Sequence, residues 1–89
     1  MLTETRRQSI LERVGGLLRH IDAGVALHDV LVDSTREQLV IVLQKGEYPV
    51  LLGISYLDYV SHRDEDLSRM LKERLEQRME AVRKREEEE

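Results

Sequence analysis

Apolar residues near the N-terminus recur with the spacing of a helix. From Arg6 onward they fall at steps of i, i+1, i+4, i+7, i+8 and i+11: Ile10, Leu11, Val14, Leu17, Leu18 and Ile21. This one-sided stripe predicts an amphipathic helix over residues 6–21. Thr3 or Thr5 is suited to cap its start, and Gly24 stands where a glycine commonly stops a helix.

The pattern changes to that of strands in the middle of the chain. Residues 27–33 are predicted to form a short strand or extended segment, and residues 34–37 a turn. A helix over residues 35–45 is the competing interpretation, because Ser34 and Glu37 have the spacing of a capping box. The β-branched run over residues 40–42 argues against that helix, since these side chains lose rotamer freedom there.

Two apolar runs, 39–43 and 48–54, are joined by residues 44–47 and predict a hairpin. Gly46 supplies the positive φ that a tight turn requires. Pro49 has no N–H to donate, so its strand is expected to be an edge strand or to be bulged at that point. Both runs are apolar at odd and even positions alike. One or two helices do not easily cover both faces of such a sheet, so we expect self-association across it.

A short helix at 56–60 and a long helix at 64–84 follow. The long helix is mostly charged and carries one narrow apolar stripe: Leu67, Met70, Leu71, Leu75, Met79 and Val82. Such a helix folds back, pairs with a copy of itself, or binds a partner. The first five stripe residues are the candidate partner-binding site.

These elements predict an α+β fold: an N-terminal helix, a small antiparallel sheet with a hairpin, a short helix and a long C-terminal helix, in a dimer. Three regions are expected. Residues 1–62 form a dimerisation domain, residues 63–85 form a helix for partner binding or oligomerisation, and residues 86–89 form an acidic tail.

Composition narrows the classes of function. The chain has 89 residues, a formal net charge of −4 and no cysteine, which excludes disulfides and thiolate metal sites. No apolar run is long enough to span a membrane, so a cytoplasmic location is expected. His62, Asp64 and Asp66 are spaced to share a metal only in a loop, and an acidic helix start explains them better. No nucleophile or phosphate loop is recognisable, so we expect no catalysis, metal or cofactor.

Basic residues outnumber acidic ones in the first twenty positions, which contain four arginines and two glutamates. Arg6 and Arg13 are seven apart and would share a helix face, with Arg7 beside them. In a dimer this basic face would be doubled and could contact DNA phosphates. The alternative is an ordinary solvated helix face.

Residues 39–60 carry a family resemblance. A strand at 40–43, the Lys45-Gly46 turn, a Pro-Val strand at 49–52 and a short helix at 55–59 resemble the Phd/YefM family of type II antitoxins. The resemblance implies a dimeric α+β domain that binds operator DNA, and a C-terminal segment that neutralises a toxin.

The resulting hypothesis is an antitoxin-like regulator. Its DNA contacts would come from Arg6, Arg7 and Arg13, and its long helix would bind a basic toxin protein. The alternative is a homo-oligomeric structural or adaptor protein that does not touch DNA.

Overall fold

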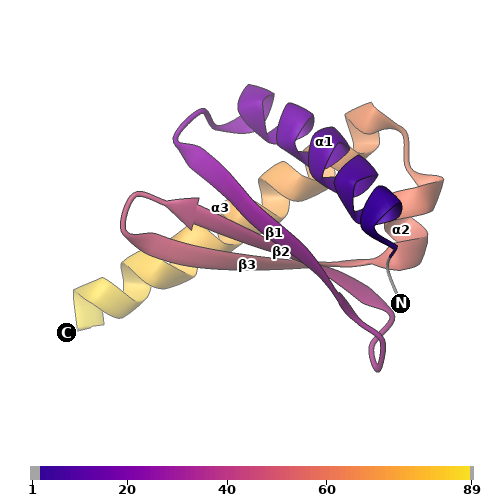
Figure 1. Ribbon diagram of the computed structural model, residues 1–89. Helices are drawn as coiled ribbons and strands as arrows, with labels where there is room; N and C mark the ends of the chain where they lie inside the picture. Colours follow the sequence, from indigo (N-terminus) through magenta and orange to yellow (C-terminus); the bar gives the residue numbers. More distant parts are fainter. Residues whose placement is uncertain (1–2, 89) are drawn as a thin grey trace.

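The chain folds as an α+β domain, as predicted. The computed structural model describes residues 3–88, with the side chains of residues 3–85. Its elements are α1 (Glu4–Ile21), β1 (Val25–Asp33), β2 (Gln38–Lys45), β3 (Tyr48–Ser55), α2 (Tyr56–Ser61) and α3 (Asp64–Glu88). Figure 1 shows α1 and α3 against the sheet, with α2 at the end of the sheet near the start of α1.

The helices α1 and α2 each begin at a capping side chain, and the cap of α1 is one of the two threonines predicted for it. The Thr3 side chain accepts a hydrogen bond from the Arg6 backbone N–H at 3.1 Å, so Thr3 is the cap of α1. Ser55 does the same for α2, accepting from Asp58 N–H at 3.0 Å. These caps satisfy backbone donors that have no partner inside the first helical turn.

The three strands form an antiparallel sheet in the order β1-β2-β3. The predicted hairpin is confirmed: Lys45 pairs with Tyr48 across the turn, and Gly46 has φ +60°. Pro49 lies in β3, which is an edge strand, as predicted. The competing helix over 35–45 is wrong, because the β-branched residues of β2 pack on both sides of a pleated strand.

One face of the sheet packs against α1 and α3 and forms the core. Alternate residues of β2 and β3 are buried there together with the inward stripes of both helices. The core consists of Ile10, Val14, Leu18, Val30, Leu39, Ile41, Leu43, Val50, Leu52, Ile54, Tyr59, Leu67, Leu71 and Leu75. Every member is apolar apart from the Tyr59 hydroxyl, so burial of hydrophobic area stabilises the fold.

The long helix α3 folds back onto the domain, which was one of the three possibilities for its apolar stripe. Leu67 and Leu71 are fully buried and Leu75 is 4% exposed, so the first half of α3 shares one core with residues 1–62. Figure 1 shows the C-terminal turns of α3 continuing past the body of the sheet. The predicted acidic tail at 86–89 lies outside the described side chains.

Candidate interaction surfaces

The face of the sheet opposite the helices carries apolar side chains that none of the described elements covers. In β2, Val40 and Val42 alternate with the buried Leu39, Ile41 and Leu43, and therefore lie on this open face. Leu31 of β1 is directly opposite Val40, and Leu51 of β3 is directly opposite Val42. We call these four residues the open-face cluster: Leu31, Val40, Val42 and Leu51.

The open-face cluster is incompletely buried by its own chain. Leu31 is 52% exposed and Leu51 is 51% exposed, whereas the two valines on the central strand are partly buried between them. Isolated exposed apolar residues are common on protein surfaces. Four on adjacent strands in one patch point to an interaction surface.

Uncharged residues surround the open-face cluster on β2 and β3. Gln38 and Gln44 lie on the same face as Val40 and Val42. A Cβ at Gly53 would lie 3.2 Å from Gln38 Oε1, so the Gln38 side chain lies over this glycine. The face therefore presents polar groups without charge around an apolar centre on these two strands.

Carboxylates occur on β1. Asp33 pairs with Gln38 at the end of the sheet, and Asp29 is opposite Val42. The Asp29 carboxylate accepts from Arg7 Nη2 at 2.6 Å and from Arg7 Nε at 3.0 Å. The hydrogen bonds from Arg7, reinforced by one from the Val30 backbone N–H, hold the pKa of Asp29 below its ordinary value. Its charge is thus already paired within the chain.

Both edges of the sheet are hindered from pairing with another strand. The β1–β2 register shifts between Leu27 and Asp29, which interrupts the regular ladder of β1. On β3, Pro49 offers no N–H, and Arg74 Nη1 donates to the Gly53 carbonyl at 3.0 Å. Such features suppress edge-to-edge association. The open face is therefore better suited to association than either edge.

The predicted DNA-binding arginines do not form one free cationic surface. Arg7 pairs with Asp29 and also with Glu4 at 3.2 Å. Arg13 donates to Asp64 at 2.8 Å, and its guanidinium lies 4.9 Å from the centre of the Tyr59 ring. These two arginines connect α1 to β1 and to the start of α3.

Arg13 makes two further hydrogen bonds, to the backbone carbonyls of Tyr59 at 3.1 Å and His62 at 2.9 Å. It thus holds the end of α2 and the following connection against α1. Arg6 is different, because its Nη1 donates at 2.6 Å to the hydroxyl of Tyr56 and no carboxylate of residues 3–85 lies within ion-pair distance.

The predicted partner-binding residues face inward. Leu67, Leu71 and Leu75 are core residues, and Met70 and Met79 are partly buried against that core. As folded, α3 does not offer this stripe to a partner. The exposed apolar residues Leu31, Leu57 and Val60 were not identified as sites from the sequence.

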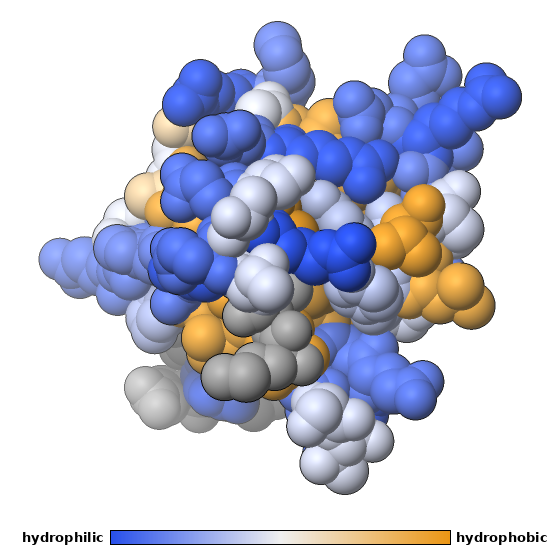
Figure 2. Space-filling view, turned by 45° about the vertical axis from the view of Figure 1, so that its right-hand side comes forward, coloured by the Kyte–Doolittle hydropathy of each residue, from blue (hydrophilic) through white to orange (hydrophobic). Residues whose placement is uncertain are grey.

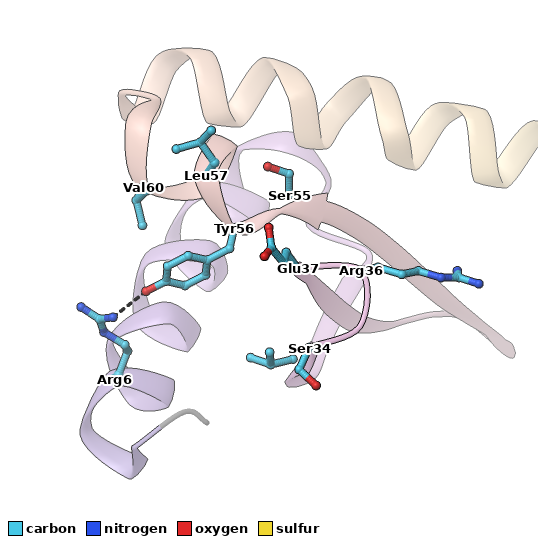
Figure 3. Close-up of a pocket in the computed structure, with 9 residues that line it drawn as sticks. Arg6, Ser34, Arg36, Glu37, Ser55, Tyr56, Leu57 and Val60 are labelled. Atoms are coloured by element: carbon cyan, nitrogen blue, oxygen red, sulfur yellow. Dashed lines mark hydrogen bonds between the residues drawn. The ribbon is translucent and has the colours of Figure 1, made fainter.

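A groove of about 580 Å³ lies between the start of α1, α2 and the β1–β2 turn (Figure 3). Its apolar lining comes from Val32, Leu57 and Val60, which are 41%, 72% and 54% exposed. Arg6 and Tyr56 line one side of it.

Most of the surface seen in Figure 2 is hydrophilic, and hydrophobic side chains occupy only limited areas of it.

Among residues 3–85, no three His, Cys, Asp or Glu side chains gather closely enough to hold a metal ion. In the candidate metal segment, Asp64 pairs with Arg13, and His62 Nδ1 lies 2.8 Å from the Asp58 carbonyl. Within the described residues, none of the helices combines the length and the apolar character that a membrane span requires.

Comparisons with protein-family models, with curated proteins and with solved structures find no match for this chain. The proposals below therefore rest on the geometry of the open face and of the groove.

Proposed function

We propose that this chain is a homodimeric protein-interaction domain without catalytic activity, and that two copies associate through the open faces of their sheets. The observation that supports this most is the open-face cluster, an apolar patch on three adjacent strands that no element within residues 3–88 covers. In a twofold dimer each protomer contributes the same patch, so the patch must be compatible with itself. The apolar centre, bordered on β2 and β3 by uncharged side chains, meets that requirement.

The area of the face sets the expected strength of the dimer. β2 and β3 have eight residues each and the sheet has three strands. At about 4.8 Å between strands and about 3.4 Å per residue, the face measures roughly 14 by 27 Å, an area of roughly 380 Å². This is below the roughly 800 Å² per partner of a standard interface. The dimer should therefore be weak and depend on concentration in the micromolar range.

The antitoxin-like function suggested by residues 39–60 is less favoured by the geometry. Arg7 and Arg13 are already paired with carboxylates of the same chain, and Leu67 and Leu71 are in its core. Neutralising a toxin with this stripe would require α3 to leave the domain, which would expose those core residues.

Sedimentation equilibrium of the wild-type protein and of Leu51→Lys tests the proposal. We expect the wild type to fit a monomer–dimer equilibrium, and Leu51→Lys to remain monomeric, because the dimer would bury two ammonium groups against apolar side chains. Leu57→Lys is the matched control, since Leu57 is exposed but lies on α2, and it should dimerise as the wild type does. A wild type that is monomeric throughout the micromolar range, or a Leu51→Lys protein with wild-type affinity, would contradict the proposal.

A further inference from the structure

The groove beside α2 is a second exposed apolar site, separate from the open face. Leu57 and Val60 are three residues apart on α2 and therefore lie on one side of it. Val32 faces them from the end of β1; its pairing with the buried Leu39 places it on the helix side of the sheet. These side chains form the apolar part of a concave surface that the chain itself leaves uncovered.

A positioned cation borders this apolar surface. Arg6 donates one hydrogen bond at 2.6 Å to the Tyr56 hydroxyl, and its guanidinium carbon lies 6.0 Å from the centre of the Tyr56 ring. These contacts orient the side chain at the side of the groove (Figure 3). A guanidinium has five donors, and no carboxylate of residues 3–85 pairs with this one. Arg6 is thus free to bind an anionic group of a partner.

The other charged residues of the groove are placed differently. Figure 3 shows the Arg36 side chain extending away from Leu57 and Val60, and Arg36 is 3.9 Å from Asp33. Figure 3 shows the Glu37 carboxylate at the backbone end of Tyr56, and the Glu37 backbone carbonyl accepts from the Tyr56 N–H at 3.0 Å. The Tyr56 side chain, in contrast, extends to Arg6. The charged group at the Tyr56 hydroxyl end of the groove is therefore the Arg6 guanidinium, which is positive.

We propose that this groove binds a segment of a partner protein that carries a large apolar side chain beside a carboxylate. The apolar side chain would contact Leu57, Val60 and Val32, and the carboxylate would accept hydrogen bonds from Arg6. An arginine next to an apolar pocket is a common arrangement at binding hot spots, because burial gives affinity and the fork of donors selects a carboxylate. This goes beyond dimerisation and uses a different surface.

Selection from a phage-displayed library of short random peptides on the immobilised protein tests the proposal. The enriched peptides should share an Asp or Glu within a few positions of a large apolar residue. A synthetic peptide with that consensus is then titrated by fluorescence anisotropy. Leu57→Asp should weaken its Kd by about tenfold or more, since it places a like charge where an apolar contact is expected.

The role of Arg6 has its own readout. Replacing the peptide carboxylate by its amide should weaken binding to the wild type severalfold but should leave binding to Arg6→Gln unchanged. Leu31→Asp is the matched control for Leu57→Asp. It makes the same change on the open face and should leave the peptide Kd unchanged, whether or not it disrupts the dimer, so the two proposals fail independently. Circular dichroism checks that each variant is folded.

Three results would overturn this inference. The first is a selection that enriches no consensus or one rich in Lys and Arg. The second is a consensus peptide that binds Leu57→Asp as tightly as the wild type. The third is binding of duplex DNA that Arg6→Gln weakens and that competes with the peptide, which would make the groove part of a nucleic-acid surface.

Discussion

The two faces of the sheet differ although the same strands form them. Ile41 faces the helices and is fully buried, whereas its neighbour Val42 faces away and is only partly buried. Both are β-branched apolar residues that favour a strand. The helix-covered face accounts for folding of the chain. The open face retains apolar area that folding does not bury, and this area is available for association.

Three ion pairs connect separate elements of the domain. Arg7–Asp29 connects α1 to β1, Arg13–Asp64 connects α1 to α3, and Lys45–Asp22 connects the end of β2 to the end of α1. Each therefore joins α1, or the residue that follows it, to another element. Among residues 3–85, no ion pair joins side chains of the open-face cluster, which are all aliphatic.

Truncation after His62 should have the largest effect. It removes Leu67, Leu71 and Leu75 from the helix-covered core, and losing each such side chain costs about 2–5 kcal/mol. The sum is comparable with the whole stability of a small domain, about 5–15 kcal/mol. Residues 1–62 should therefore be unfolded by circular dichroism. Truncation after Glu80 keeps these leucines and should remain folded; a folded 1–62 fragment would contradict the shared core.

Alanine substitutions on neighbouring positions compare the two faces directly. Ile41→Ala should lower the free energy of unfolding by about 2–5 kcal/mol, because it leaves a cavity in a packed core. Val42→Ala should lower it by less than about 1 kcal/mol at concentrations where the protein is monomeric, since Val42 is already in contact with solvent. Urea denaturation measures both values. Equal losses would show that the open face is covered within one chain.

Acid should weaken the attachment of α1 to β1 through Asp29. Its folded-state pKa is lowered from the ordinary 3.8, so its contribution is fully present above that pH and is lost as the pH falls through the lowered pKa. The free energy of unfolding should fall less steeply below about pH 4 in Asp29→Asn than in the wild type. Arg7→Gln should reduce the slope in the same way. An unchanged slope in both variants would exclude this pair as a source of acid sensitivity.

Salt should have the smallest effect, and it distinguishes the open face from a charged interface. Because the open-face cluster is uncharged, screening should change the dimer Kd only about twofold between low and high ionic strength. Sedimentation equilibrium at several salt concentrations measures this. A steep decrease in affinity with salt would indicate that charged residues outside the cluster hold the dimer together.

Local patterns in the sequence were sufficient to predict most of the fold. The spacing from Ile10 to Leu18 predicted α1, and the positive φ required at Gly46 predicted the hairpin. The apolar character of both faces of β2 predicted that helices alone would leave one face open. These features depend on residues that are close in sequence, and the periodicity of apolar positions is sufficient to predict them.

The candidate sites depended on contacts distant in sequence and were less predictable. Arg7 pairs with Asp29, which is 22 residues away, and Arg13 pairs with Asp64, which is 51 residues away. The spacing of residues within α1 does not indicate either partner. The direction in which α3 folds back decides that Leu67 is buried. The groove forms only where α1, α2 and the β1–β2 turn meet. Leu57 and Val60 can therefore be recognised as part of a site only once the fold is known.

The most direct test of dimerisation through the open face is an isotope-filtered NOE experiment on a mixture of ¹³C-labelled and unlabelled protein. It detects only methyl groups that approach each other between protomers and needs no substitution. We predict intermolecular NOEs among the methyl groups of Leu31, Val40, Val42 and Leu51. Intermolecular NOEs confined to Leu57, Val60 or α3, or none at concentrations where sedimentation shows a dimer, would contradict the account.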